Sequence, residues 1–499
     1  MRIVYAGEAG TPHTDSYLRF LDGFGSVTFI DVDLLPRAVL DDVNLLVVDA
    51  GWQHEAPPGL SLERLAAPTV LVGTFGAKVG DSLHLKLGRN YGCMCLGGDA
   101  IVWNAAHPVF SGLAGCLAEK APPANFRAYS SILDVPDAVS TLRVLRDPIG
   151  KPGYVTAGFG FLDSPECEIL AGGFNEKTQE HFAIARQGRF LQWGFAGSPD
   201  DYTDEGRMLL ANCLRYIRRF GGDPVREFRT TSPRAILMML IAMEGWRGIG
   251  LPREFSDAMQ MEFLQNLFVG EIPEAMFGER AQRVAWFRAN EPFLRNEGDG
   301  WFVDREAQQL GLGNHTIAML DACLSRPDGA ASSLWLRYTG RSLDDVDRER
   351  VWLAEHYRYL YFTDWGGYRW ASTLDPPQPL LPRAAPRVPE PKAILTAARY
   401  ENRINAILLL DIPTGFHAYA PGATDGLPLS LKIGEGFELI EDLQISQPSE
   451  EHIQGAAVIR FSARGNLDVL HASLRVQLCD SLACLPPQIL TLRCALTTA

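Results

Sequence analysis

A cluster of prolines near residue 380 limits how this chain of 499 residues can fold. Seven prolines fall between residues 375 and 391, namely Pro376, Pro377, Pro379, Pro382, Pro386, Pro389 and Pro391. Proline fixes φ and has no backbone N–H, so such a stretch supports neither a packed helix nor a sheet ladder. It favours a semi-rigid polyproline II spacer. We therefore predict a linker over residues 373–394, with separate domains before and after it.

The composition is that of a globular protein large enough for about three domains, with 46% apolar and 21% charged residues. The formal net charge of −14 offers no surplus of cations to neutralise phosphates, which argues against a nucleic-acid partner. The best apolar run, Ala235–Met243, is about half of the roughly 20 residues that span a bilayer. We predict a buried helix there and no membrane-spanning segment.

Residues 1–222 alternate strand-like and helix-like segments. The strand-like runs are bounded by turn residues and comprise Ile3–Tyr5, Val27–Ile30, Leu45–Val48 and Thr69–Val72. This rhythm predicts an α/β domain with a mostly parallel, flavodoxin-like sheet. Residues 169–195 predict antiparallel strands with a turn at Gln187-Gly188. A helix follows, with Thr203 as N-cap and a buried stripe of Leu210, Cys213, Leu214 and Ile217.

The middle segment, residues 225–372, loses the strand alternation and takes on helical periodicity. Ser232-Pro233 is typical of a helix start, and Trp352, His356, Tyr359 and Leu360 fall on one helical face. We predict an all-helical module that serves as a spacer or as a protein-interaction module. The aromatic string Tyr361–Tyr368 suggests no catalytic chemistry, and aromatic residues at such density are more often core.

Residues 395–499 return to a β pattern. The predicted strands are Ile407–Leu410, Ala457–Phe461, Leu474–Leu478 and Ile489–Leu492, separated by Gly, Pro and Asn turns. This spacing predicts a small antiparallel β-sandwich. The whole chain is thus expected to combine α/β, all-α and all-β parts.

Two cysteines, Cys479 and Cys484, flank a four-residue loop between the last two of these strands. Residues that face each other across an antiparallel pair have Cα atoms about 4.5–5.5 Å apart, within the range of about 4.4–6.8 Å that a disulfide accepts. We predict that the two sulfurs lie near the sandwich tip, where a partner thiol reaches them. Spacing alone leaves three interpretations open, namely a redox pair, a static disulfide and two unrelated buried thiols.

The register of this hairpin presents a difficulty. If Cys479 faces Cys484, Leu474 faces Ile489, whereas the more apolar face of the outgoing strand is Leu490, Leu492 and Cys494. A bulge near Pro486-Pro487 would reconcile the two patterns, because proline cannot donate to the ladder.

Residues 400–499 resemble the amino-terminal domain of the thiol:disulfide interchange protein DsbD. That family shows an aromatic-His-x-Tyr segment leading to Pro-Gly and Gly-Leu-Pro, then a terminal cysteine hairpin followed by Pro-Pro. The matching residues here are Phe416-His417-Ala418-Tyr419-Ala420-Pro421-Gly422, Gly426-Leu427-Pro428 and Cys479–Pro487. The resemblance implies an immunoglobulin-like sandwich in which Cys479 and Cys484 are the catalytic redox pair.

The resemblance also implies partners, because that family's domain takes electrons from a membrane partner and passes them to periplasmic thioredoxin-like proteins. This sequence shows no multi-helix membrane domain and no Cys-x-x-Cys thioredoxin module, so its redox partners would act in trans. Met1-Arg2 leads directly into the strand-like Ile3–Ala6 without a secretory signal. The sequence by itself thus favours the cytoplasm and the resemblance favours the periplasm.

Residues 1–222 resemble class I glutamine amidotransferase-like proteins of the ThuA type. The resemblance rests on Ile3–Ala6, His107–Leu113 and Gly188–Phe195. Working amidotransferases of this fold place a cysteine nucleophile on a strand-to-helix elbow, where this chain has Gly73-Thr74-Phe75-Gly76 after Thr69–Val72. Acyl transfer needs a nucleophile with a base in reach. We therefore expect a non-catalytic domain that binds a partner or a small molecule, the latter at the carboxyl ends of the strands.

Other polar motifs favour structural roles. His107 precedes a proline and is expected to make a structural hydrogen bond. Cys93-Met94-Cys95 is too closely spaced for an ordinary zinc half-site, and Gly7–Gly10 lacks the full dinucleotide fingerprint. Asp200, Asp201, Asp204 and Glu205 suit a helix start better than a calcium loop. We expect neither a metal nor an organic cofactor.

Three functions remain for the whole chain. The first is an accessory thiol–disulfide exchange protein that uses Cys479 and Cys484, with protein-disulfide oxidoreductase activity. The second is a scaffolding protein or a protein that binds a small molecule, such as a sugar; in both cases the sandwich is only structural. The third is a hydrolase with an unrecognised site in residues 1–222.

Overall fold

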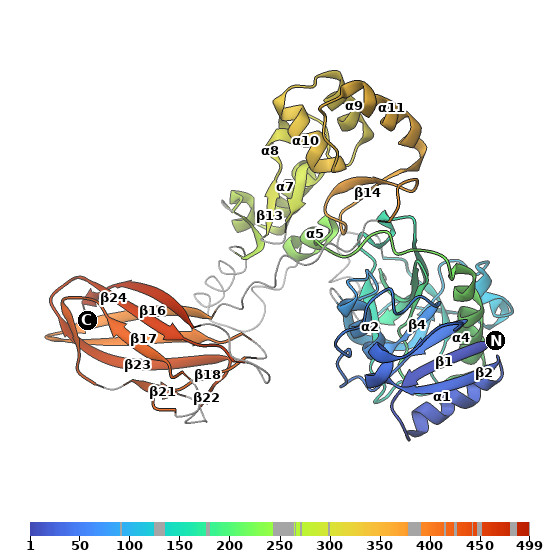
Figure 1. Ribbon diagram of the computed structural model, residues 1–499, viewed down its shortest axis with the longest axis horizontal. Helices are drawn as coiled ribbons and strands as arrows, with labels where there is room; N and C mark the ends of the chain where they lie inside the picture. Colours follow the sequence, from blue (N-terminus) through green and yellow to red (C-terminus); the bar gives the residue numbers. More distant parts are fainter. Residues whose placement is uncertain are drawn as a thin grey trace. The chain divides into compact units, whose positions relative to one another are not determined.

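The computed structural model describes residues 1–89, 92–123, 135–175, 180–242, 264, 266–269, 272–297, 300–377, 391–413, 416–423, 427–441, 443–446, 452–479 and 487–498. The chain divides into two compact units, Met1–Pro379 and Leu380–Ala499 (Figure 1). The segments 1–222 and 225–372, which differ in sequence pattern, lie together in the first unit. Most of the predicted linker, residues 378–390, lies outside the described residues.

The first unit is built on an 11-stranded sheet. Its order is β2-β1-β3-β4-β11-β10-β8-β5-β7-β6, with β9 pairing β10 and β5. The strands are β1 (Arg2–Gly7), β2 (Ser26–Asp31), β3 (Leu45–Val48), β4 (Thr69–Val72), β5 (Gly92–Ile101), β6 (Ala118–Lys120), β7 (Val139–Arg143), β8 (Gly153–Ala157), β9 (Cys167–Asn175), β10 (His181–Gln187) and β11 (Phe190–Trp193). Strands β2, β1, β3, β4 and β11 are parallel, and the pairings from β11 onward are antiparallel. The predicted α/β sheet is therefore confirmed at this level.

Helices cover both faces of the parallel part. Alternate residues of a strand point to opposite faces, so Ile3 packs in one cluster with α1 (Pro12–Asp22) and α4 (Asp204–Ile217). Its neighbour Val4 packs in another cluster with α2 (Gly73–Ser82). A strand buried on both faces must be apolar at every position, which accounts for the continuous apolar run of β3.

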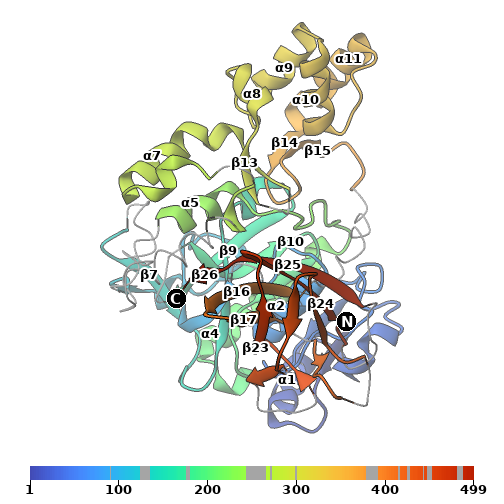
Figure 2. The same ribbon diagram turned by 90° about the vertical axis from the view of Figure 1, so that its left-hand side faces the viewer.

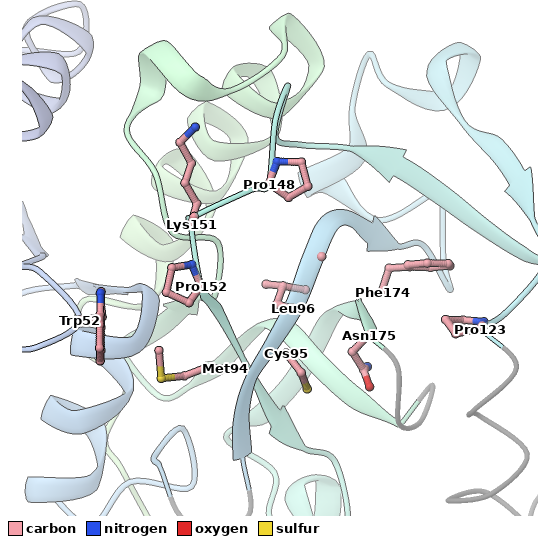
Figure 3. Close-up of a pocket in the computed structure, with 12 residues that line it drawn as sticks. Trp52, Met94, Cys95, Leu96, Pro123, Pro148, Lys151, Pro152, Phe174 and Asn175 are labelled. Atoms are coloured by element: carbon pink, nitrogen blue, oxygen red, sulfur yellow. The ribbon is translucent and has the colours of Figure 1, made fainter.

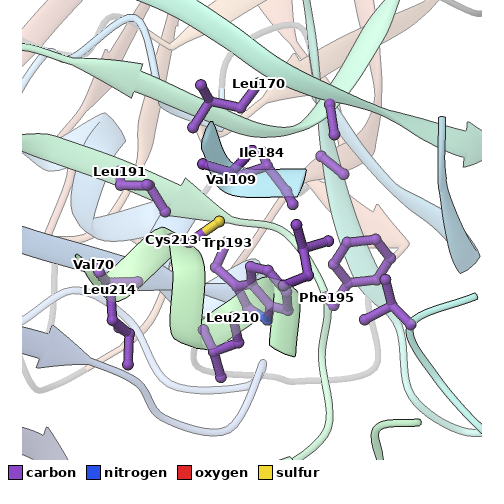
Figure 4. Packing of buried hydrophobic residues seen from close by; sticks show 14 of the residues in the cluster. Val70, Val109, Leu170, Ile184, Leu191, Trp193, Phe195, Leu210, Cys213 and Leu214 are labelled. Atoms are coloured by element: carbon purple, nitrogen blue, oxygen red, sulfur yellow. The ribbon is translucent and has the colours of Figure 1, made fainter. Parts of the chain in front are cut away.

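The helix α4 closes this part as predicted. The side chain of Thr203 accepts a hydrogen bond from the Gly206 backbone N–H at 2.9 Å, which satisfies an otherwise unpaired donor of the first turn. The buried stripe of α4 packs against Trp193 in the core (Figure 4). The stripe consists of Leu210, Cys213, Leu214 and Ile217. The predicted hairpin is also confirmed, but its turn lies one residue later than predicted, at Gly188-Arg189, because Gln187 still pairs with Phe190.

The prediction of an all-helical middle is wrong in part. The segment contains the helices α5 (Arg234–Ala242), α7 (Arg280–Asn290), α8 (Arg305–Gln309), α9 (Ile317–Ser325), α10 (Gly329–Thr339) and α11 (Val346–His356). It also contains two hairpins, β12 (Leu294–Asn296) with β13 (Trp301–Val303) and β14 (Leu360–Thr363) with β15 (Arg369–Ser372). Figure 2 shows α8, α9, α10 and α11 grouped together, with β14 and β15 next to α10.

A buried polar network joins the middle segment to the α/β sheet. Lys86 is fully buried and forms an ion pair with Asp163. The other carboxylate oxygen of Asp163 accepts hydrogen bonds from the Thr363 hydroxyl at 3.1 Å and from the Asp364 backbone N–H at 2.8 Å. The indole of Trp365 donates to the Phe159 carbonyl at 2.9 Å. These contacts make residues 1–379 one compact unit.

The second unit is formed of sheets around one core, and their pairings are antiparallel except for the parallel pair of β16 with β26. A six-stranded sheet contains β16 (Lys392–Tyr400), β17 (Arg403–Asp411), β20 (Phe437–Leu439), β21 (Gln444–Ser446), β23 (Ala456–Gly465) and β26 (Thr497–Thr498). A three-stranded sheet contains β19 (Ser430–Ile433), β24 (Val469–Val476) and β25 (Gln488–Ala495), and a small one pairs β18 (Ala418–Tyr419) with β22 (His452–Ile453). Leu408 and Ile459 of the first sheet pack in the same cluster as Leu470 and Leu474 of the second. Among the described residues, no helix has the length and apolarity that a membrane crossing requires.

Candidate functional site

Cys479 lies three residues after the end of β24. Its backbone forms an antiparallel bridge with His417, with the His417 N–H donating at 2.8 Å and the Cys479 N–H donating back at 2.9 Å. The sulfur is disulfide-bonded, and Cys484 lies outside the described residues. The prediction of an exposed sulfur is wrong for Cys479, because this residue is only 1% exposed.

The hairpin register agrees with the apolar pattern. Leu474 faces Leu490, and Val476 faces Gln488. If Cys479 faced Cys484 in an uninterrupted ladder, Leu474 would face Ile489. The observed pairing is shifted from that register by one residue, which is the shift that a bulge produces. The predicted bulge near Pro486 lies outside the described residues.

Three aromatic rings gather around His417, the backbone partner of Cys479. A pair that exchanges both backbone hydrogen bonds has its side chains on the same face, so the side chains of His417 and Cys479 share one face of the bridge. Tyr419, two residues on, faces His452 across the β18–β22 pair. The ring centroids lie 4.7 Å apart for His417 and His452, 5.4 Å for His417 and Tyr419, and 5.2 Å for Tyr419 and His452.

The sequence pointed to two of these three rings. His417 and Tyr419 belong to the motif that carries the resemblance, whereas His452 lies on a strand more than 30 residues later and has no motif of its own. Only the pairing of β18 with β22 places His452 here.

The elbow of the α/β part lies at the carboxyl end of β4. Gly73 begins α2 with φ of +58°, a left-handed conformation that favours glycine. The next residue, Thr74, donates its hydroxyl to the Pro152 carbonyl at 3.2 Å. The chain therefore turns sharply from strand to helix at Gly73. Because glycine has no side chain, this position supplies no nucleophile.

A buried carboxylate follows β3 at the same edge of the sheet. Asp49 is 3% exposed and accepts hydrogen bonds from the Tyr5 hydroxyl at 3.0 Å and from His13 Nε2 at 2.6 Å. Burial and the charge of Asp49 raise the pKa of Tyr5, which keeps the phenol protonated as a donor. Burial lowers the pKa of His13, but the charge and hydrogen bond of Asp49 outweigh it and the net shift is upward. His13 and Asp49 thus form a charge-assisted pair.

A second histidine–carboxylate pair lies near the first. His54 Nε2 contacts Glu8 at 2.9 Å, and Glu8 also accepts the Gly51 backbone N–H at 2.6 Å. Glu8 follows β1, and Gly51 and His54 follow β3. Because the carboxyl ends of parallel strands share one edge of a sheet, both pairs come together from separate stretches of sequence. No motif in the sequence signals them.

A cavity of about 1000 Å³ is lined by residues of β5 and β9, by Trp52 after β3 and by the segment before β8 (Figure 3). Trp52 and Met94 line one side, Phe174 lies on the opposite side, and Lys151 and Pro148 lie above in this view. Cys95 also lines the cavity and is bonded to Cys93. The sequence prediction assigned no role to this cysteine pair.

The remaining sequence-predicted residues have structural roles. His107 accepts the Val109 backbone N–H at 3.3 Å through Nδ1, and its Nε2 contacts Glu168 at 3.1 Å. The expected structural hydrogen bond is therefore confirmed. Asp201 accepts the Ser198 backbone N–H at 2.8 Å in a capping box, as befits a helix start. Among the described residues, no three His, Cys, Asp or Glu side chains form a group suited to a metal ion.

Comparison with known proteins yields only weak, partial resemblances of fold. No protein-family model matches the sequence, and no curated protein matches it. Among solved structures, the N-terminal periplasmic domain of ScsB from Proteus mirabilis is 13% identical, with a TM-score of 0.17, over 21% of this chain. This chain spans 45% of that protein's chain. The DsbD N-terminal domain of Neisseria meningitidis in the reduced form is 13% identical, with a TM-score of 0.14, over 21% of this chain and 83% of its own.

A third solved structure shows a similarly weak resemblance. A putative GMP synthase protein from Thermoplasma acidophilum is 12% identical, with a TM-score of 0.25, over 44% of this chain and 95% of its own. The findings thus amount to weak fold resemblances to thiol–disulfide exchange domains and to an amidotransferase-like protein, each over part of the chain. At these scores they assign no role to any residue.

Proposed function

We propose that the protein exchanges thiols and disulfides through Cys479 and Cys484, with redox proteins such as thioredoxin-like partners acting in trans. The observation that carries this proposal is the disulfide-bonded Cys479, whose backbone pairs with that of His417. His417 in turn belongs to a cluster of three rings. An immunoglobulin-like sandwich and a periplasmic location are parts of the same proposal.

The exchange is a two-step reaction that conserves atoms and electrons. In the reduced protein, one thiolate of the pair attacks a partner disulfide, and a mixed disulfide forms while the partner's other sulfur leaves as a thiolate. The second cysteine then attacks the mixed disulfide, which releases the partner as a dithiol and leaves the pair oxidised. We infer that the imidazole of His417, whose side chain lies on the same face of the bridge as that of Cys479, takes up the thiol proton.

The burial of Cys479 gives the exchange a kinetic character. Cys479 is 1% exposed as a residue, so its sulfur is shielded from small thiols in solution. Thiol–disulfide exchange requires access to a sulfur. We therefore expect slow reaction with small reductants and faster reaction with a protein that docks over the ring cluster.

The test is a redox titration of the full-length protein, with the state of Cys479 and Cys484 mapped by alkylation and peptide mass. We expect a reduction potential above about −300 mV, because structural disulfides lie below about that value. Cys494→Ser is the matched control, since Cys494 on β25 is a free, half-buried thiol. A pair that stays oxidised down to potentials below that value would establish a static disulfide.

The ring cluster supplies a second readout. His417→Gln is expected to slow reduction of a partner disulfide about tenfold around neutral pH and to flatten its pH profile, because a proton acceptor is lost. His471→Gln is the comparison, since His471 lies on an exposed position of β24. Equal rates in the two variants at every pH would remove His417 from the mechanism.

A second candidate function is the binding of a small hydroxylated molecule, such as a sugar, at the carboxyl edge of the α/β sheet. It is favoured by the two histidine–carboxylate pairs, His13 with Asp49 and His54 with Glu8. Carboxylates accept and imidazoles donate hydrogen bonds to hydroxyl groups. Thermal shifts with a panel of monosaccharides and disaccharides test it, and a shift that His13→Asn and His54→Asn both abolish supports it. The absence of any shift across the panel counts against it.

A further inference from the structure

The second cysteine pair of the chain lies in an irregular part of β5. Two residues apart along a regular strand, Cα atoms are about 6.8 Å apart, at the limit of what a disulfide spans. The Cα atoms of Cys93 and Cys95 are 5.4 Å apart. The pairing of β5 with β8 shifts register between Cys93 and Leu96. This irregularity shortens the strand locally and brings the two cysteines within bonding range.

This disulfide is poorly suited to stabilising the fold. A cross-link stabilises a protein mainly by restricting its unfolded chain, and the effect grows with the length of the loop that it closes. The loop here contains a single residue, Met94, between the two cysteines. The neighbouring strands already hold β5 on both sides through β7, β8 and β9. A bond with so little structural benefit suggests a chemical role.

The disulfide also faces a space large enough for a substrate. Cys95 lines the cavity of about 1000 Å³, together with the apolar side chains of Trp52, Met94 and Phe174. Both cysteines are only partly buried. Of the two, Cys95 is therefore the sulfur that a molecule in the cavity reaches.

One cation lines the same cavity. The Lys151 ammonium group contacts Asp201 at 3.2 Å and donates to the Asp147 carbonyl at 3.2 Å. An ammonium group has three donors, so within the part of the chain that the structure describes one donor is left for a ligand. A carboxylate on the ligand suits this position.

We propose that Cys93 and Cys95 form a second thiol–disulfide site, whose substrate is a small thiol that carries a carboxylate and enters the cavity beside Lys151. The substrate thiolate attacks Cys95 Sγ, the bond between the two cysteines breaks, and Cys93 leaves as a thiolate that takes a proton from water. A second substrate thiolate attacks the mixed disulfide and frees Cys95. Two thiols are thus oxidised to one disulfide as the cysteine pair gains two electrons and two protons, and the reverse reaction restores the pair.

This site is independent of the one proposed for Cys479. Its test uses the full-length protein in buffers with set ratios of reduced to oxidised glutathione, and peptide mass mapping reports each cysteine pair separately. We expect the Cys93–Cys95 bond to open and close reversibly as the ratio changes. A bond that stays closed at every ratio overturns the proposal, whatever the Cys479 pair does.

A trapping variant identifies the attacked sulfur. In Cys93→Ser, Cys95 is left as a thiol and is expected to form a mixed disulfide with oxidised glutathione at least tenfold faster than Cys116 does in the same molecule. Cys116 is a free, exposed cysteine and serves as the internal control. Equal rates at the two positions overturn the assignment of Cys95, and the Cys116 rate shows that the reagent is active.

The role of the cation is tested with two oxidants. Lys151→Met in the Cys93→Ser background is expected to lower the Cys95 rate about fivefold with oxidised glutathione, because a charge that attracts carboxylates is lost. The rate with uncharged 2-hydroxyethyl disulfide is expected to stay within twofold. Equal losses with both reagents would show that the substitution disturbs the cavity itself and overturn the carboxylate assignment. Thermal unfolding of each variant identifies any loss of folding.

Discussion

Glu180 shows how a single buried carboxyl group makes stability depend on pH. Glu180 precedes β10, and its backbone carbonyl accepts the Gly158 N–H at 2.9 Å. Burial raises the pKa of its side chain from 4.5 to about 7. The folded protein therefore binds a proton here that the unfolded chain has already released over the range between these two values.

The sign of the effect follows from proton linkage. Because the folded state binds more protons, the free energy of unfolding falls as the pH rises from about 4.5 to 7. We predict that Glu180→Gln is more stable than the parent protein at pH 8 and gains little at pH 4. Denaturant unfolding at both values measures this. Glu119→Gln, at an exposed position of β6, is the control, and a gain that is equal at both pH values would contradict the prediction.

Residues of the site differ in how visible they are in sequence. Cys479, His417 and Tyr419 belong to ordered motifs within one predicted domain, so sequence patterns pointed to them. His13 lies in the first turn of α1 and Asp49 directly follows β3, and the two meet only through the parallel order of β1 and β3. The Cys-x-Cys spacing of Cys93 and Cys95 is visible in the sequence, but the irregularity of β5 that brings them together has no sequence signature.

Elements were predictable where local and tertiary preferences agree. For the helix α4 the sequence predicts an N-cap, an acidic first turn and a buried stripe, and the structure shows all three. The helical face predicted through Leu360 fails because α11 ends at His356 and Leu360 begins β14. There the pairing of β14 with β15 overrides helical periodicity. The i, i+4 contact survives only between Trp352 and His356, whose rings stack at 4.9 Å.

The attachment of the middle segment to the sheet yields a prediction at the scale of elements. Asp163→Asn leaves Lys86 buried without its counter-charge, and removal of one partner of a buried pair costs about 3–5 kcal/mol. We predict a loss of stability of this size for the first unit. Chemical denaturation followed by tryptophan fluorescence measures it.

Two variants give this prediction its controls. Asp200→Asn breaks an exposed pair with Arg19 and is expected to cost less than about 1 kcal/mol. The double variant Lys86→Met/Asp163→Asn is expected to lose less than Asp163→Asn alone, because no buried charge is left unpaired. A double variant less stable than the single one would contradict this account of the buried network.

At the scale of the whole molecule, the two compact units have separate cores. Leu214 packs within the first unit and Leu408 within the second. We predict two thermal transitions in calorimetry. Leu214→Ala is expected to lower the transition temperature of the first unit, and Leu408→Ala that of the second. Each substitution is expected to reduce the free energy of unfolding of its own unit by about 2–5 kcal/mol. A single transition that both variants shift would show that the units unfold together.

The elbow at Gly73 has a consequence for protein engineering. A Cβ atom at this position would lie 3.8 Å from the Ala196 Cα and 3.9 Å from the Phe195 carbonyl oxygen, which are ordinary contacts. The cost of a side chain is then mainly that of a left-handed backbone, about 1–2 kcal/mol. The backbone at this turn thus has room for a side chain, and Gly73→Cys would install a thiol there without a steric clash at its Cβ.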